Sequence, residues 1–160
     1  MILRLKKSVA FVGMMGAGKT AVGRAVAEKL NAPFLDSDHE IEQAANMSVA
    51  EIFARDGEAF FRDREAQVIR RLFENEICVL STGGGAFMSQ EVREIMTHYG
   101  ISLWIKADLD LLWSRVKSKD TRPLLQTADP YRALNSIFKA RKDTYALADL
   151  IVEARKELSI

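Results

Sequence analysis

Very little in this sequence points away from an ordinary globular protein. The 160 residues include one cysteine and three prolines, and the formal net charge is only +1. Cys78 alone cannot form an internal disulfide, which suits a reducing cytosol, and its apolar surroundings favour a buried thiol over a nucleophile. The balanced charge argues against a nucleic-acid or membrane partner, because both usually require clustered Lys and Arg.

Long apolar runs and targeting signals are missing as well. No stretch of the chain approaches the roughly 20 apolar residues that a membrane-spanning helix needs. Residues 1–7 carry charges without a long apolar region behind them, so we expect no signal peptide and a cytoplasmic protein. The hydrophobic content of 48%, without repeats or linkers, predicts a single domain over residues 1–160.

One glycine-rich segment carries the strongest signal in the chain. Residues 13–20 read G-M-M-G-A-G-K-T, which matches the P-loop pattern G-x-x-x-x-G-K-[ST]. Its glycines permit the unusual dihedrals that turn several backbone N–H groups towards one phosphate chain. Lys19 would place a charge on the outer phosphates, and the Thr20 hydroxyl is a candidate Mg²⁺ ligand. The predicted nucleotide-binding residues of this loop are Gly13, Met14, Met15, Gly16, Ala17, Gly18, Lys19 and Thr20.

The flanking segments supply the context that a P-loop requires. Residues 8–12 are apolar and strand-like, and residues 21–30 repeat apolar side chains four apart, as one face of a helix does. The start of that helix would also direct its positive dipole end at the phosphates. We therefore expect a nucleoside triphosphate to bind here, and the motif leaves open whether the protein is a kinase or another NTPase.

Strand and helix patterns alternate through the rest of the chain. Apolar strand-like runs are expected at 34–35, 77–81, 103–105 and 150–152. Helical patterns occupy 41–45, a segment opening with a capping box at 48, 58–74, 89–99, 107–117 and a segment beginning at 129–130. In a parallel α/β sheet, ligands gather at the carboxyl ends of the strands.

Two carboxylates follow the second predicted strand directly. Asp36 and Asp38 would lie at the mouth of the crevice, where one could hold a hydrated Mg²⁺ and the other could orient or deprotonate an attacking hydroxyl. The alternative is that Asp38 only caps the helix that starts near Glu40. His39 has no partner at metal-ligand spacing and is interpreted as a bystander.

Arg62 and the glycines at 83–85 also have two interpretations each. Arg62 could form a solvated ion pair with Glu58 or Glu65, or it could bind a substrate carboxylate beside the aromatic residues that precede it. Three consecutive glycines are entropically costly, and a backbone that must touch a ligand closely would explain them better than a plain turn would.

Two more arginines are candidates for anion binding. Residues 117–127 are charge-rich and lack periodicity, which is typical of a mobile loop or of a lid in which Arg122 meets the transferred phosphoryl group. Arg141 lies at the edge of the buried stripe of the helix that starts at Pro130. A charge turned partly towards a core needs a partner, so a ligand anion is plausible.

Taken in order, these motifs make the chain similar to the shikimate kinase family from about Ser8 to Glu153. The resemblance rests on five motifs besides the P-loop, all in the family's order. They are D-x-D at Asp36 and Asp38, F-R at Phe61-Arg62, G-G-G at Gly83 to Gly85, R-P-L at Arg122-Pro123-Leu124, and an arginine four before a tyrosine at Arg141 and Tyr145.

The resemblance implies a fold and a reaction. The fold is a three-layer αβα P-loop domain of the nucleoside-monophosphate-kinase type, with a five-stranded parallel sheet of order 2-3-1-4-5 and a lid at about 117–128. The reaction is transfer of a phosphoryl group from ATP to the 3-hydroxyl of shikimate, in chorismate and aromatic amino acid biosynthesis. Mg²⁺ is the implied cofactor, ATP and shikimate are the implied partners, and a monomer is expected.

The same resemblance implies residue roles. Lys19 and Arg122 would stabilise the transferred phosphoryl, Asp38 would bind ring hydroxyls and act as base, and Asp36 would join Thr20 in the magnesium shell through water. Shikimate would be held by Asp38, Arg62, Arg141 and the backbone of Gly83, Gly84 and Gly85. Arg115 would pack on adenine. The substrate-side shell would include Phe53, Phe61 and Glu65.

The chain departs from the family pattern at two places. Asp143 stands where the family usually has a proline, two before Tyr145. Only residues 154–160 follow the last predicted strand, so the family's adenine loop and final helix are expected to be missing or shortened. The alternatives are another small-metabolite P-loop kinase, similar to gluconate kinase, or a non-catalytic ATP-binding relative.

Overall fold

The computed structural model describes residues 3–117 and 125–156. Its strands are β1 (Ser8–Val12), β2 (Phe34–Asp36), β3 (Val79–Ser81), β4 (Gly100–Lys106) and β5 (Leu150–Glu153). Its α-helices are α1 (Lys19–Lys29), α2 (Ser37–Ala45), α3 (Val49–Asp56), α4 (Glu58–Asn75), α5 (Gln90–Tyr99), α6 (Leu109–Val116) and α7 (Pro130–Tyr145), with a 3-10 turn η1 at Ala86–Met88.

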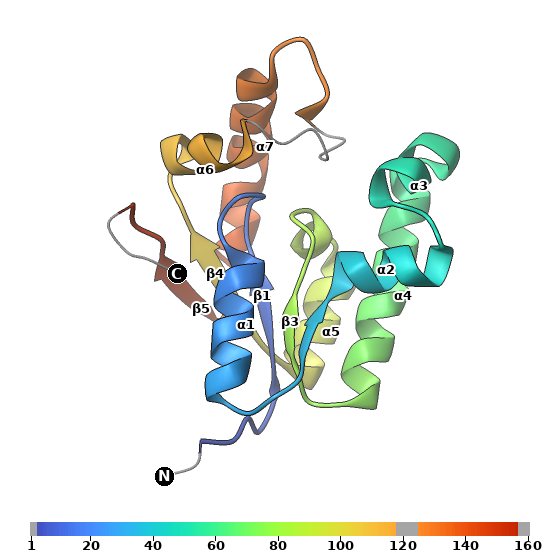
Figure 1. Ribbon diagram of the computed structural model, residues 1–160, viewed down its shortest axis with the longest axis vertical. Helices are drawn as coiled ribbons and strands as arrows, with labels where there is room; N and C mark the ends of the chain where they lie inside the picture. The colour runs from blue at the N-terminus through green and yellow to red at the C-terminus, as the bar shows by residue number, and fades with distance from the viewer. Residues whose placement is uncertain (1–2, 118–124, 157–160) are drawn as a thin grey trace.

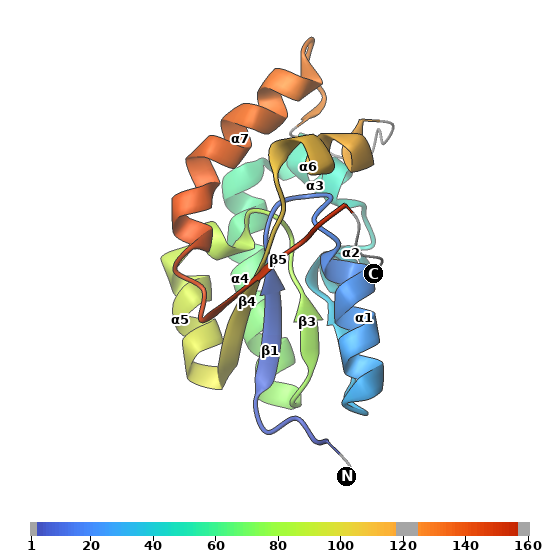
Figure 2. The same ribbon diagram turned by 90° about the vertical axis from the view of Figure 1, so that its left-hand side faces the viewer.

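The five strands form one parallel sheet in the order β2-β3-β1-β4-β5. This is the expected order, and the expected three-layer α/β architecture is confirmed. Figure 2 shows α1 on one face of the sheet and α4 and α5 on the other. The central strand β1 is buried along its whole length, as the apolar run at 9–12 predicts.

The topology gathers the carboxyl ends of β1, β2 and β3 at one end of the sheet. There the P-loop leaves β1, the D-x-D segment leaves β2 and the glycine run leaves β3, while α2 and α3 lie above the same end (Figure 1). Motifs that are far apart in the sequence therefore share one edge, which is where ligands bind in open α/β sheets.

Gly100, which follows the helix predicted at 89–99, caps the C-terminus of α5 with its N–H donating to the Met96 carbonyl oxygen, and it also begins β4. It pairs with Ser8 of β1, and a Cβ atom on Gly100 would overlap the Ser8 carbonyl oxygen. The missing side chain lets the two strands approach closely at the start of the ladder, so this glycine serves both the helix terminus and the sheet.

Two further boundaries differ from the sequence prediction. Helix α2 begins at Ser37 rather than at residue 41, so Asp38 lies in its first turn. Strand β3 starts two residues later than expected, and Ile77 is 48% exposed.

The predicted buried thiol is confirmed, because Cys78 is fully buried and burial raises its pKa to about 11. Within the described residues, no helix has the length and apolar character needed to cross a membrane.

Candidate active site

The phosphate loop owes its shape to three glycines. Gly13, Gly16 and Gly18 have φ of 142°, 83° and 100°, a region that residues with a side chain rarely adopt. The close packing around the loop excludes a side chain as well. A Cβ atom on Gly13 would lie 2.8 Å from the Ile105 carbonyl oxygen, and one on Gly16 would lie 2.8 Å from Val116 Cγ1.

Lys19 opens α1 and turns back over the loop. Its ammonium group donates to the carbonyl oxygens of Gly13 and Met14, at 2.7 and 3.0 Å, and only 9% of the residue is exposed. These bonds hold the charge beside the backbone that would surround a phosphate chain. The start of α1 adds its own positive dipole at the same place.

Oxygen ligands for a small cation lie next to this charge. Thr20 Oγ1 is 3.3 Å from Asp36 Oδ2 and 3.3 Å from Ser81 Oγ. No group of three or more His, Cys, Asp or Glu suited to a metal occurs in the described part of the chain. A hydroxyl and a carboxylate beside a phosphate loop fit Mg²⁺, which keeps several waters and takes further oxygens from the phosphates.

The capping alternative for Asp38 is wrong, because Asp36 performs that role. Asp36 Oδ1 accepts from the backbone N–H groups of Asp38 and His39, at 3.0 and 3.2 Å, and so closes the first turn of α2. This bond leaves the Asp38 side chain available on the inner side of the helix.

One pocket of about 440 Å³ joins these groups. Its wall is shared by the P-loop, the two aspartates, the end of β3 and α6, and the residues that line it include Gly18, Lys19, Thr20, Asp36, Asp38, Thr82, Gly83, Gly84 and Arg115. The pocket therefore runs continuously from the phosphate loop to the glycine run. A donor phosphate and an acceptor hydroxyl could meet in it.

Each glycine of the run at 83–85 lies against a charged side chain. A Cβ atom on Gly83 would lie 2.8 Å from Asp38 Oδ1 and 3.1 Å from Glu65 Oε2. On Gly84 it would lie 3.3 Å from Arg141 Nη1, and on Gly85 it would overlap the guanidinium of Arg62. The glycines thus let two carboxylates and two guanidinium groups converge on one stretch of backbone, from α2, α4 and α7.

Both interpretations of Arg62 have structural support. Arg62 donates to Glu65 Oε1 at 2.9 Å and to Glu58 Oε1 at 3.3 Å, so the ion pairs exist. Its guanidinium also lies 5.2 Å from the centre of the Phe61 ring, at the glycine run. The ion pairs hold the guanidinium at the site, so they do not compete with a binding role.

Several buried polar atoms at this place lack a protein partner. Asp38 Oδ1, Glu65 Oε2 and Arg141 Nη1 form no hydrogen bond within the described residues. Buried polar groups are normally satisfied, and three exceptions at one glycine run indicate a ligand of mixed charge and hydroxyl character.

The two buried carboxylates bind protons more tightly than carboxylates in water do. Burial raises the pKa of Asp38 to about 6, assisted by the charge of Asp36, while Lys19 opposes the rise. Burial also raises the pKa of Glu65 to about 7, and Arg62 limits that rise. Perturbed carboxylates of this kind gather at functional sites.

The remaining predicted residues lie at the nucleotide side. Arg115 of α6 donates to the carbonyl oxygens of Gly16 and Ala17, at 3.0 and 3.1 Å, so it lies against the P-loop. Arg122 and most of the predicted lid lie outside the described residues. Leu125, just after them, is 7% exposed.

The sequence and the fold of this chain are both similar to those of known shikimate kinases. The family model described as shikimate kinase matches residues 15–160. The shikimate kinase of Ruegeria pomeroyi is 62% identical over 98% of this chain and 80% of its own length, and that of Cereibacter sphaeroides is 61% identical over 94% and 76%. Among solved structures, shikimate kinase from Acinetobacter baumannii in complex with shikimate superposes with a TM-score of 0.90, 38% identity, and coverage of 94% and 84%.

The chain belongs to the shikimate kinase family. Members of this family are ATP-dependent kinases, so the expected enzyme class is confirmed. A gluconokinase from Sinorhizobium meliloti is also similar, but at 14% identity and a TM-score of 0.55 the likeness is one of fold alone. The chain spans 74–80% of the length of the first three curated relatives.

Sequence reasoning missed several polar groups that shape the site. Ser81 approaches Thr20, and Ser37 Oγ accepts from the backbone N–H of Gly83 at 3.3 Å. The Tyr145 hydroxyl donates to the Gly84 carbonyl oxygen. The position of Ser81 at the end of β3 was an available signal, since polar residues at strand ends face the crevice. The contact of Tyr145 depends on packing that no local pattern shows.

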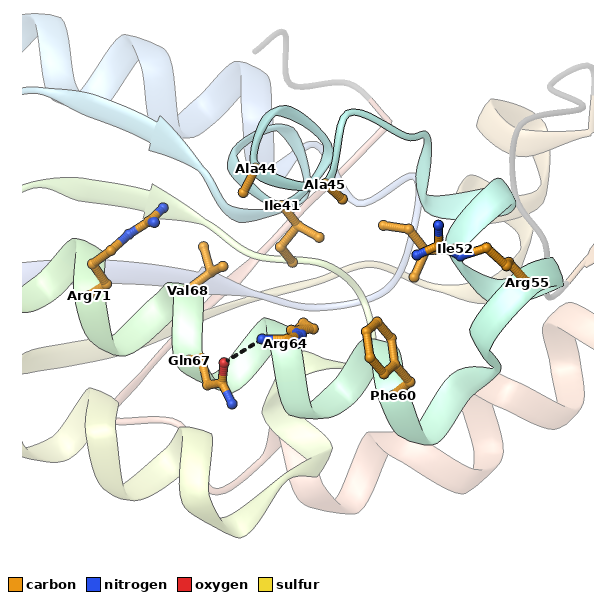
Figure 3. A pocket seen from close by; sticks show the side chains of 10 residues that line it. All are labelled: Ile41, Ala44, Ala45, Ile52, Arg55, Phe60, Arg64, Gln67, Val68 and Arg71. Atoms are coloured by element: carbon orange, nitrogen blue, oxygen red, sulfur yellow. Dashed lines mark hydrogen bonds between the residues drawn. The ribbon is translucent and has the colours of Figure 1, made fainter.

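A second hollow, of about 440 Å³, lies away from these residues between α2, α3 and α4 (Figure 3). Buried Ile41, Ile52 and Val68 form its apolar part, and Arg55, Arg64 and Arg71 are exposed at its rim. None of the predicted site residues lines it. It is separate from the pocket that contains the P-loop.

Proposed function

We propose that this chain transfers the γ-phosphoryl group of ATP to the 3-hydroxyl of shikimate, giving ADP and shikimate 3-phosphate for aromatic amino acid biosynthesis. The observation that carries this proposal is the convergence of Asp38, Glu65, Arg62 and Arg141 on the glycine run, of which Gly83 and Gly84 line the pocket of the P-loop. A small polyhydroxylated acid needs both guanidinium groups and a carboxylate acceptor for its hydroxyls.

The donor half would hold the nucleotide. Backbone N–H groups of residues 13–20 surround the phosphates, and Lys19 neutralises their outer charge. Arg115 borders the loop and is proposed to pack on the adenine, as the family resemblance implies. Arg122 is proposed to approach the transferred group from the lid at about 117–128, as the family resemblance implies.

The acceptor half would fix the acid. Arg62 and Arg141 bind its carboxylate, together with the backbone of Gly83, Gly84 and Gly85. Orientation is the main requirement of phosphoryl transfer, because the chemistry needs little covalent help from the protein. The ion pair of Arg62 with Glu65 keeps its guanidinium in place before the acid arrives.

Asp38 would handle the proton. Its carboxylate accepts the proton of the 3-hydroxyl as that oxygen forms a bond to the γ-phosphorus, and the bond from phosphorus to the β–γ bridging oxygen breaks. Asp36, through water, and Thr20 are the residues that would hold Mg²⁺. That ion would supply charge neutralisation on the phosphate oxygens.

The proposed unit of function is a single domain over residues 1–160, acting as a monomer. The donor and acceptor groups described above all come from one chain. A second subunit is therefore not required to complete either half.

An ADP-release assay over a panel of acceptors tests the proposal. We expect turnover with shikimate, and none above background with quinate, gluconate or no acceptor. Preference for gluconate would assign the chain to another small-metabolite kinase. Nucleotide binding without turnover on any member of the panel would identify a non-catalytic relative.

A further inference from the structure

Tyr145 is buried between the two halves of the site, although neither half as described so far uses it. It is the last residue of α7, only 1% exposed, and its hydroxyl donates to the carbonyl oxygen of Gly84. The same hydroxyl lies 4.0 Å from Met14 Sδ in the P-loop. One side-chain group thus contacts both the acceptor backbone and the phosphate loop.

Gly84 is itself the point where the two halves touch. A Cβ atom on Gly84 would lie 3.6 Å from Met15 N and 3.8 Å from the Gly13 carbonyl oxygen, both in the P-loop. It would lie 3.3 Å from Arg141 Nη1 on the acceptor side. Any shift of the P-loop backbone around a nucleotide therefore acts directly on the surface beside Arg141.

The ring of Tyr145 is fixed by a second contact to the donor half. It stacks on Trp104 of β4 with ring centroids 5.7 Å apart and planes inclined by 28°. Trp104 in turn packs against Gly13, where a Cβ atom would lie 3.2 Å from Trp104 Cδ1. Stacked aromatic pairs favour one relative arrangement, so the hydroxyl is held at a defined position.

We propose that Tyr145 is a positioning residue that couples the nucleotide loop to the acceptor site, so that bound nucleotide strengthens shikimate binding and bound shikimate strengthens nucleotide binding. The proposal rests on the proposed function, because it takes shikimate as the acceptor. Tyr145 touches neither substrate; it acts by fixing Gly84 between the P-loop and Arg141. Coupling of this kind is reciprocal by thermodynamic necessity.

The donor role of the hydroxyl requires its proton. Burial raises the pKa of Tyr145, so the phenol stays protonated over the whole range in which the enzyme would be assayed. The Gly84 carbonyl oxygen can only accept, which fixes the direction of the bond.

Titration calorimetry of Tyr145→Phe tests the coupling. The Kd of shikimate is measured with and without saturating ADP, and the ratio of the two values is the coupling factor. We expect a factor of about 5 or more in the parent protein, within the usual range for coupled sites. In Tyr145→Phe the ring still stacks on Trp104 but the bond to Gly84 is lost, so the factor should fall to within about twofold of 1.

Two further variants show whether the loss of coupling is specific to the Tyr145 hydroxyl. Tyr131→Phe makes the same change at the exposed start of α7, and it should keep the parental coupling factor. Trp104→Phe keeps the Tyr145 hydroxyl but loosens its stacking partner, so it should lower the factor by a smaller amount, and it tests the proposal even where Tyr145→Phe folds poorly.

Two results would overturn the inference. One is a coupling factor near 1 in the parent protein. The other is a coupling factor in Tyr145→Phe and Trp104→Phe that equals the parental value. That result, including the case in which only the melting temperatures of the variants fall, would make Tyr145 a structural residue. Failure of the proposed function looks different, because shikimate would then not bind the parent protein with or without ADP.

Discussion

The donor and acceptor halves of the site are built in opposite ways. The donor half consists mainly of backbone from eight consecutive residues, shaped by three glycines with positive φ. The acceptor half consists of charged side chains from α2, α4 and α7, brought to one glycine run by the sheet topology. In the proposed function the donor half would bind a group common to all ATP-dependent enzymes, whereas the acceptor half would have to distinguish one small acid from others.

The two halves also differ in how completely their charged and polar groups are hydrogen-bonded. In the donor half Lys19 is satisfied by carbonyl oxygens of its own loop. In the acceptor half Asp38, Glu65 and Arg141 keep buried polar atoms that have no hydrogen-bond partner among the described residues, and two carboxyl pKa values are raised. The acceptor half thus carries a stability cost that the donor half avoids, as expected where side chains are arranged for a ligand.

The largest expected effect comes from removing the proposed base. Asp38→Asn keeps the size of the side chain but removes its ability to accept a proton as a carboxylate. We expect kcat to fall about 10²- to 10⁴-fold, the range attributed to general base catalysis. The Kd of ATP should stay within about twofold, because Asp38 belongs to the acceptor half. Steady-state kinetics and nucleotide titration measure the two quantities.

Asp63→Asn on α4 is the matched control for that experiment. Asp63 is exposed and accepts a hydrogen bond from Gln67, so the same change of chemistry should leave both kcat and the Kd of ATP at parental values. Equal losses of turnover and ATP binding in Asp38→Asn would refute the assigned role and would erase the separation of the two halves.

The next largest effect concerns the carboxylate of the acid. Arg62→Ala removes a guanidinium that lies at the glycine run, and it leaves Glu65 without its cation. We expect the KM for shikimate to rise about 100-fold, because truncating one member of a buried charged set is costly. The KM for ATP should change by less than about threefold. Arg70→Ala, at an exposed position two turns along α4, should change neither.

A pair of glycine substitutions compares the halves directly. Gly85 has φ −94°, so alanine fits its backbone, and the new methyl group would displace only the end of the Arg62 side chain. We expect Gly85→Ala to raise the KM for shikimate about tenfold through misplacement of that guanidinium, with a nearly parental melting temperature.

Gly16→Ala is the counterpart in the donor half. Its φ of 83° and the contact with Val116 Cγ1 make alanine strained there. We expect weaker ATP binding and a lower melting temperature, because backbone strain of this kind costs of order 1–3 kcal/mol. Acceptor binding measured without nucleotide should be unchanged. If both variants impaired the same substrate, the two halves could not be treated as separately built.

The same contrast explains how much could be predicted from the sequence. The P-loop could be recognised as a motif because its shape depends on local backbone conformation, which eight neighbouring residues encode. The strand order and the family followed from motifs in sequence, and both were confirmed. Arg62, Arg141 and the glycine run could each be singled out as candidates, but only the resemblance joined them in one site, because nothing local shows that two arginines on different helices approach the same glycines.

The predictions for element boundaries and caps were incomplete for a related reason. The start of α2 was placed four residues too late because the Asp36 side chain, which caps it, was interpreted only as a ligand. Gly100 does cap α5, but its second role at the start of β4 could not be predicted, because its approach to Ser8 is a property of the sheet. In each case one residue serves two purposes, and a sequence pattern revealed only one of them.

The smallest effect is on stability, and it tests the cost carried by the acceptor half. Glu65 has a pKa of about 7 in the folded protein against 4.5 for the ordinary carboxyl group. Between these values the folded state holds a proton that the unfolded state releases, so the free energy of unfolding falls as pH rises through about 7. Below pH 4.5 both states are protonated and the loss is absent. Glu65→Gln cannot titrate, so it escapes this loss.

Urea denaturation at pH 5 and pH 8 measures the difference between Glu65→Gln and the parent protein. We expect the variant to gain about 1 kcal/mol or more relative to the parent between the two pH values, since each pKa unit corresponds to about 1.4 kcal/mol. Glu91→Gln, at an exposed position in α5, should show a constant difference. A constant difference for Glu65→Gln too would mean that Arg62 and Arg141 compensate the buried carboxylate fully. The acceptor half would then be as well satisfied as the phosphate loop, and the contrast between the halves would be one of geometry alone.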